Sequence, residues 1–113
     1  MSIYDKLTEL GIVLPPVSVP AAAYVPFVQT GNLIFLSGHI AKQDGKPWVG
    51  QLGLTMTTDE AKPAARAVAI DLLGTLAAAC LAAGKTLDDV KRIVKVLSLV
   101  NSTATYTEQH LVT

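Results

Sequence analysis

The chain has 113 residues and no net charge, because nine basic residues balance nine acidic ones. This length fits one domain with a single core, and the balanced charge argues against a nucleic-acid-binding surface, which needs a clear basic excess. Half of the residues are hydrophobic, a high fraction for a small monomer, so we expect part of the apolar surface to be buried between subunits.

Compartment and membrane signals are weak. The single cysteine, Cys80, cannot form an internal disulfide, which favours the reducing cytoplasm, and a buried inert thiol is its simplest role. The first residues lack a basic region followed by an apolar run, so we predict no signal peptide. The apolar run 64–83 is interrupted by Arg66 and Asp71. We therefore expect a core helix there and no membrane span.

The N-terminal twenty residues predict a helix and a connector. Residues 2–10 have a short apolar stripe, Ser2 and Asp5 have the spacing of a capping box, and Gly11 is placed to end the helix. Residues 14–20 contain three prolines and predict an extended connector.

Residues 24–39 predict a β-hairpin that ends in polar residues. Two short apolar runs flank a turn at residues 30–32, where Gly31 takes a positive φ at low cost. The second run, 33–36, is apolar on both faces, which predicts a central strand covered on both sides. It ends in Ser37, Gly38 and His39. A hydroxyl, a bare backbone and an imidazole there suggest a place where a small molecule approaches the main chain.

The middle of the chain predicts a strand and then the main helix. An Asp44-Gly45 turn leads into a glycine-weakened strand at Trp48–Gly53. Thr57 and Glu60 have capping-box spacing, which places the helix start at Thr58 or Asp59. The helix is expected to run to Ala83 with Gly84 as its stop, and Pro63 is tolerated in the first turn. The apolar stripe that should lie on the sheet is Ala65, Val68, Leu72, Leu76, Cys80 and Ala83.

The last third predicts a long strand and a helix start. Val90–Val100 alternates apolar residues on two faces and is expected to be buried on both. Residues 101–103 form a turn, and Thr105 and Glu108 mark the beginning of another helix.

One stretch resembles a known family. The pattern Ala21-x-x-Tyr24, followed by the run Gly31–Gly38, resembles the RidA/YjgF family of reactive-intermediate deaminases, also named after L-PSP endoribonuclease. In that family a glutamine usually stands where this chain has His39. The resemblance extends to the last residue. It implies a single α+β domain of the chorismate mutase type: a mixed sheet with helices on one face, three copies of which form a barrel-like homotrimer with clefts between subunits.

The resemblance also implies a substrate site at Tyr24, Ser37, Gly38 and His39. Each residue has a simpler interpretation. Tyr24 could anchor a strand end, Ser37 could be a turn hydroxyl, and His39 is more simply a pocket wall or a hydrogen-bonded core residue than a base. The family carries its catalytic arginine and glutamate on strands after the second helix, beyond Thr113, so no catalytic residue is assigned. We expect the native chain to continue with those strands, or the edge of Val90–Val100 to pair with another chain.

The implied reaction hydrolyses 2-iminobutanoate and 2-iminopropanoate to 2-keto acids and ammonia, without a cofactor. Two alternatives stay open: a non-catalytic protein that binds a small carboxylate or regulates a partner, and an endoribonuclease that inhibits translation. Only Lys91, Arg92 and Lys95 form a basic group, too few for strong nucleic-acid binding. His39 and His110 are far apart without cysteine partners, so no metal site is predicted.

Overall fold

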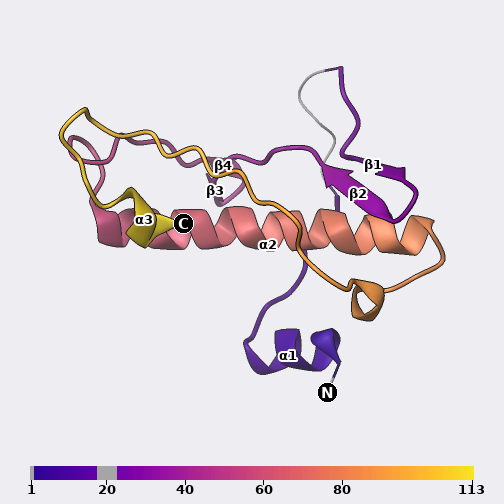
Figure 1. Cartoon of the computed structure of the whole chain (residues 1–113). Coiled ribbons are helices and arrows are strands. Elements are labelled where there is room, and N and C mark those ends of the chain that lie inside the picture. The colour runs from indigo at the N-terminus through magenta and orange to yellow at the C-terminus, as the bar shows by residue number, and fades with distance from the viewer. Residues whose placement is uncertain (1, 18–22) are drawn as a thin grey trace. The chain divides into compact units, whose positions relative to one another are not determined.

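The computed structural model describes residues 2–17 and 23–113. The elements in chain order are α1 (Ile3–Glu9), β1 (Phe27–Thr30), β2 (Leu33–Leu36), β3 (Lys42–Gln43), β4 (Lys46–Pro47), α2 (Thr58–Ala82), the 3-10 turn η1 (Leu87–Asp89) and α3 (Gln109–Val112) (Figure 1). The last residues of the predicted connector, 18–20, and Ala21 of the resemblance lie outside the described residues.

Two compact parts make up the chain, and each has its own packing. The first comprises Met1–His39 and Ile70–Ile93, and the second comprises Ile40–Ala69 and Val94–Thr113. Helix α2 contributes its second half to the first part and its first half to the second part. The expectation of a single domain stays a prediction.

Helix α1 confirms the predicted capping box. The Ser2 hydroxyl accepts a hydrogen bond from the Asp5 amide at 3.1 Å, and the Asp5 carboxylate accepts one from the Ser2 amide at 3.2 Å. Gly11, with φ 69°, ends the helix as expected. So short a helix is marginal alone and needs to dock on other elements.

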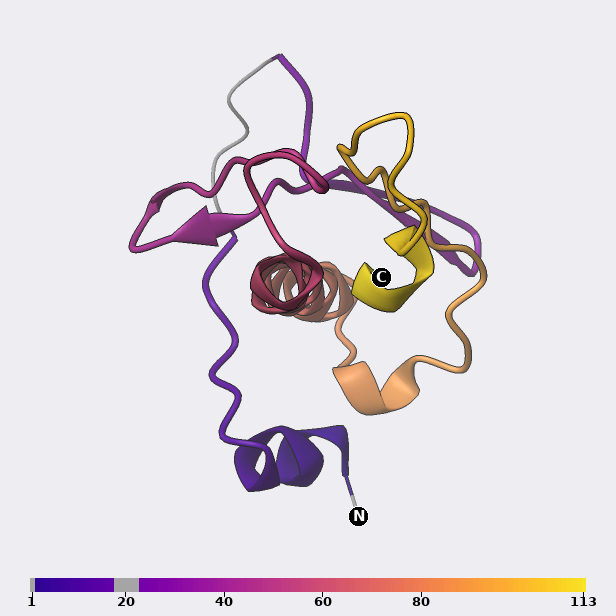
Figure 2. The same ribbon diagram turned by 90° about the vertical axis from the view of Figure 1, so that its left-hand side faces the viewer.

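The docking partner of α1 is η1, as Figure 2 shows. The Ile3 amide donates to the Asp88 carboxylate at 2.7 Å, and the Leu87 amide donates to the Tyr4 hydroxyl at 3.0 Å. Beneath these bonds Leu7, Cys80 and Leu87 form a buried core. Apolar residues that pack against it are Ile12, Leu14, Ile34, Leu73, Leu76, Ala77 and Val90.

Strands β1 and β2 form the predicted hairpin. Phe27 pairs with Leu36 and Thr30 with Leu33, so the turn is Gly31-Asn32, and Gly31 has the positive φ of 57° that such a turn requires. The expectation that β2 is central and covered on both sides is wrong for the described residues. It pairs with β1 alone, and its exposure alternates, because Leu33 and Phe35 are exposed whereas Ile34 and Leu36 are half-buried.

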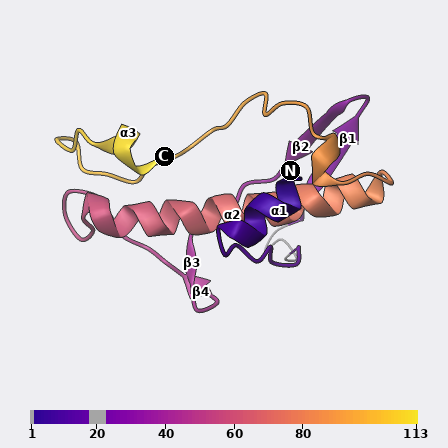
Figure 3. The same cartoon turned by 90° about the horizontal axis from the view of Figure 1, so that it is seen from below.

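The second part begins with a smaller hairpin (Figure 3). Strands β3 and β4 are joined by Asp44 and Gly45, whose φ angles of 54° and 76° confirm the predicted turn. The predicted strand Trp48–Gly53 is wrong. Only buried Leu52 makes a parallel bridge, with Ser102 and with Met56. Gly53 has φ 89°, and the next three amides turn back onto the Gln51 carbonyl, which ends any ladder.

Helix α2 begins and ends close to where the sequence predicts. The Thr57 hydroxyl accepts from the Glu60 amide at 3.2 Å, and Gly84, with φ 71°, follows the last turn. Pro63 lies in the second turn, one turn later than expected. In length and composition the helix could cross a membrane, so the absence of a membrane span stays a prediction.

The buried stripe of α2 differs in part from the predicted one. Cys80 is buried as expected, whereas Ala83 is exposed beyond the end of the helix. The buried side chains of α2 are Ala61 and Ala64 in the second part and Thr75, Ala79 and Cys80 in the first. Small side chains dominate the stripe, and at Gly74 the Pro15 backbone lies too close for a Cβ atom.

The predicted long strand Val90–Val100 is absent from the described structure. Residues 91–100 have no strand partner there, and Val94, Val96, Leu97 and Leu99 are 71–86% exposed. Alternating apolar residues favour a strand, but a strand exists only where a second backbone accepts its hydrogen bonds. The helix expected from Thr105 and Glu108 begins a few residues later, at Gln109.

The result is an α+β fold of helices and small antiparallel hairpins. The expected mixed sheet is not formed by the described residues, whose two sheets each have two antiparallel strands.

Candidate functional site

The four predicted site residues, Tyr24, Ser37, Gly38 and His39, all lie in the first part, at the open end of the β1–β2 hairpin. The Ser37 amide donates to the Pro26 carbonyl at 2.9 Å, which continues the strand pairing one step beyond β2. Tyr24 comes directly before Val25, whose carbonyl is bonded to the Ser37 side chain. The tyrosine side chain itself is 48% exposed.

Ser37 is tied to the facing strand through its side chain. Its hydroxyl donates to the Val25 carbonyl at 2.5 Å. A hydroxyl has one hydrogen and two lone pairs. Because the hydrogen is used within the hairpin, the Ser37 oxygen can only accept a hydrogen bond from a ligand.

Gly38 differs from every other glycine of the chain. Five glycines have a positive φ, and Gly50 and Gly74 lie against Met56 and Pro15. Gly38 has an ordinary φ, and a methyl group added to it would meet nothing within 4 Å. The described fold therefore does not require a glycine at position 38.

His39 is joined to helix α2. Its Nε2 lies 3.1 Å from the hydroxyl oxygen of Thr75, which is only 1% exposed. The Thr75 hydroxyl also donates to the Asp71 carbonyl one turn earlier, at 3.2 Å. His39 thus fits its simpler interpretation, a hydrogen-bonded residue at the edge of the core, and it places the end of the hairpin on α2.

The core below this site contains the thiol of Cys80. Burial raises the pKa of Cys80, and the Asp89 carboxylate raises it further. The thiol therefore stays protonated and inert at neutral pH, in agreement with the role expected from the sequence.

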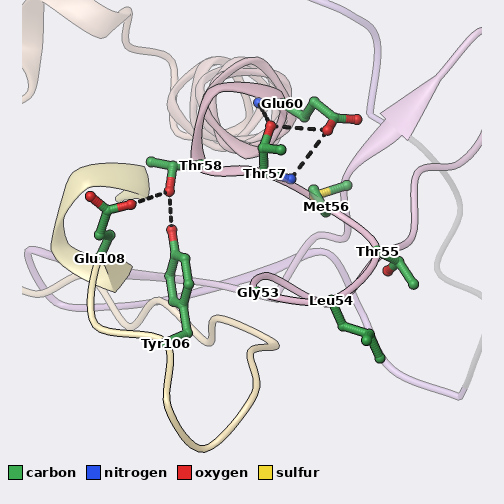
Figure 4. A pocket seen from close by; sticks show the side chains of 9 residues that line it. All are labelled: Gly53, Leu54, Thr55, Met56, Thr57, Thr58, Glu60, Tyr106 and Glu108. Carbon is green, nitrogen blue, oxygen red and sulfur yellow. Dashed lines mark hydrogen bonds between the residues drawn. The ribbon is translucent and has the colours of Figure 1, made fainter.

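A second group of polar residues meets in the second part (Figure 4). The Thr58 hydroxyl donates to the Glu108 carboxylate at 2.7 Å and lies 2.5 Å from the Tyr106 hydroxyl, beside a cavity of about 430 Å³. Because the hydrogen of Thr58 goes to Glu108, Tyr106 is the donor to Thr58. Glu60 accepts from Thr57 at the same cavity. These groups are paired with one another and tie residues 106–108 to the start of α2.

Sequence reasoning missed Thr75 and the meeting of Thr58 with Tyr106 and Glu108. Thr75 sits among alanines and leucines in the helix, and only its polarity within an apolar stripe could have drawn attention to it. The pairs Thr57/Glu60 and Thr105/Glu108 each indicate a helix start, but their spacing carries no information that the two starts meet. No group of three metal-ligating side chains occurs among residues 2–17 and 23–113.

No family model matches this chain, but it is similar to several known proteins. The Trypanosoma cruzi protein TCP17 is 41% identical over 108 residues, which are 95% of this chain and 65% of TCP17. The crystal structure of Atu1372 from Agrobacterium tumefaciens, a protein with unknown function, is 34% identical with a TM-score of 0.78, and the match covers 96% of this chain and 63% of Atu1372. This chain therefore spans just under two thirds of the length of both.

A third relative bears on the fold. A "putative endoribonuclease" from Shewanella oneidensis MR-1 has a TM-score of 0.89 at 25% identity, and the match covers 99% of this chain and 72% of that protein. The chain therefore shares its α+β fold with the Shewanella protein, and this likeness supports the RidA-like fold.

Proposed function

We propose that the chain binds a small 2-imino or 2-keto acid at Ser37, Gly38 and His39, with Tyr24 beside them, and takes part in hydrolysis of the imine. The observation that carries the proposal is Gly38. A glycine with an ordinary φ and open space around it contributes nothing to the fold and costs backbone entropy. A bare backbone is useful where another molecule has to come close to its N–H and C=O groups.

The chemistry of the neighbouring groups suits this reaction. In imine hydrolysis water adds to the C=N carbon, the nitrogen takes up the protons, and ammonia leaves as the C=O bond forms. The Ser37 oxygen can accept a hydrogen bond from the attacking water or from the protonated imine nitrogen, since its own hydrogen is held by Val25. The Gly38 backbone can hold an oxygen of the ligand.

A homotrimer is part of the proposal. The open side of the site and the large number of exposed apolar side chains, among them Tyr24 at 48% and Val25 at 57%, leave room for another copy of the chain to cover the ligand. Such a site explains why few groups converge on Gly38 within one chain.

The test compares Gly38→Ala with the unchanged protein and with Gln29→Ala. Gln29 lies on the same hairpin near its turn, and its side chain bonds to the Gly31 carbonyl, so it is a matched control. The rate of ammonia release from 2-iminobutanoate, formed in solution, should fall at least tenfold in Gly38→Ala and stay unchanged in Gln29→Ala. Melting temperatures should agree for all three. Equal rates in Gly38→Ala and the unchanged protein would exclude this site.

A second candidate is ribonuclease activity, because the Shewanella protein is described as a "putative endoribonuclease". Lys91, Arg92 and Lys95 are exposed, but the chain has no net charge. RNA binding should therefore be weak and disappear as salt is raised. RNA cleavage that survives about 200 mM salt would favour the ribonuclease over the deaminase. Binding of the keto acid without imine hydrolysis would favour the non-catalytic alternative.

A further inference from the structure

Thr75 is the only buried polar side chain among the described residues, and it contacts a residue of the proposed site. Its hydroxyl lies within hydrogen-bond distance of two groups, the Asp71 carbonyl at 3.2 Å and His39 Nε2 at 3.1 Å. A carbonyl can only accept, so Thr75 gives its one hydrogen to Asp71. The contact with His39 then needs a hydrogen on Nε2.

The bond from Thr75 to Asp71 favours one tautomer of the imidazole. A neutral histidine carries one ring hydrogen, so protonation of Nε2 leaves a lone pair on Nδ1. Nδ1 is bonded to Cγ and is therefore the ring nitrogen nearer the main chain. Ser37, on the other side of Gly38, also offers only an acceptor, because its hydroxyl hydrogen goes to Val25. With this tautomer, both side chains next to Gly38 offer hydrogen-bond acceptors.

We propose that Thr75 is a positioning residue, which holds His39 with Nε2 protonated so that Nδ1 acts as a hydrogen-bond acceptor in the Gly38 site. The inference rests on the proposed function for the identity of the ligand. It specifies a molecule that donates hydrogen bonds at this point, such as a protonated imine nitrogen or the attacking water. The carboxylate and carbonyl oxygens of the acid, which only accept, are then left to backbone N–H groups.

The first test reads the tautomer directly by ¹⁵N NMR of the imidazole rings, with exposed His110 as an internal control. His39 should show a protonated Nε2 whose hydrogen exchanges slowly with water, unlike that of His110. Thr75→Val should remove this protection, and Thr75→Ser, which keeps the hydroxyl, should restore it. A His39 ring protonated at Nδ1 would overturn the proposal, since Thr75 would then donate to Nε2.

The second test reads the acceptor role. For 2-iminobutanoate hydrolysis, kcat/KM should fall about five- to tenfold in Thr75→Val and recover in Thr75→Ser, the loss expected for one misplaced hydrogen bond. His39→Gln places an amide N–H near the position of Nε2 but has no atom equivalent to the Nδ1 lone pair. It should therefore melt like the unchanged protein and show the same loss of rate.

Two outcomes would contradict the acceptor role of His39 Nδ1. Full activity in His39→Gln would make His39 a structural tie between the hairpin and α2. A rate lost in Thr75→Val with the ring hydrogen still protected would assign the effect to packing. If the unchanged protein does not hydrolyse the imine, the proposed function fails and the acceptor role fails with it, while the NMR measurement still decides whether Thr75 sets the tautomer.

Discussion

Gly38 and Gly74 illustrate how differently one residue type can be used. Gly74 is in the middle of helix α2, where a methyl group would lie 2.5 Å from the Pro15 carbonyl oxygen, so packing explains it. Gly38 has no such neighbour and no unusual φ. The sequence alone does not distinguish these two glycines. Their surroundings in the structure do: Gly74 has a packing role, and for Gly38 we propose a role in ligand binding.

At the same scale, Cys80 leads to a prediction about pH. Burial and Asp89 raise the pKa of the thiol in the folded state. A raised pKa means that the folded protein holds the proton more tightly than the unfolded chain. The free energy of unfolding should therefore be unaffected by this group below the ordinary thiol range, about pH 8.5, and decrease as the pH rises above it.

Urea unfolding of the unchanged protein and of Cys80→Ser at pH 7 and pH 9.5 would measure this effect. Relative to Cys80→Ser, the free energy of unfolding of the unchanged protein should decrease between pH 7 and pH 9.5. At pH 9.5 the thiol ionises in the unfolded chain, which stabilises the unfolded state. A thiol reagent should also react slowly with the native protein at pH 7 and rapidly in denaturant. Rapid reaction in the native state would show that the thiol is accessible.

At the scale of elements, the sequence predicts the hydrogen-bonded ends of helices and the first hairpin well, but not the strands at 48–53 and 90–100. The capping pairs Ser2/Asp5 and Thr57/Glu60 are local, so spacing alone identifies them. The first hairpin was also predictable, since its turn and its partner strand are adjacent in sequence. The strand predictions for residues 48–53 and 90–100 are wrong. A strand needs a hydrogen-bonding partner elsewhere in the chain, and the alternation of apolar residues does not specify that partner.

Helix α2 supplies the prediction at this scale. In an isolated helix, Gly74→Ala would be stabilising by about 1 kcal/mol. Here the added methyl group would meet backbone, which cannot rotate away, and overpacking of this kind costs about 1–3 kcal/mol. We expect a net loss of stability in Gly74→Ala, in contrast to Gly38→Ala. Urea unfolding would measure both variants. A more stable Gly74→Ala protein would show that residues 12–17 do not pack on α2 as described.

For the molecule as a whole, the polar strand end at Ser37, Gly38 and His39 could be noticed from the sequence itself, whereas Tyr24 could be named only through a resemblance to a family. No spacing rule connects Tyr24 with Ser37, and nothing in the sequence connects His39 with Thr75. The strand register brings the first pair of segments together, and packing of the hairpin on α2 brings the second pair together. The sequence thus identifies single residues, and the structure adds which of them contact one another.

The apolar surface makes a prediction about assembly. Val94, Val96, Leu97 and Leu99 are among many large apolar residues that are more than 70% exposed in one chain. Such exposure is unusual in a monomer and favours burial between copies. Light scattering after size exclusion should give three times the mass of one chain. A stable monomer at micromolar concentration would contradict the proposed homotrimer and leave the open side of the site uncovered.

The central claim is that a small acid binds at the open end of the first hairpin. The most direct measurement is a titration of the ¹⁵N-labelled protein with 2-oxobutanoate, the product of the proposed reaction, followed through the backbone amide signals. The amides of Ser37, Gly38 and His39 should shift together and saturate, and Gly38→Ala should abolish the shifts. Shifts confined to the Thr58, Tyr106 and Glu108 cluster, or no saturable shifts at Gly38, would contradict the claim.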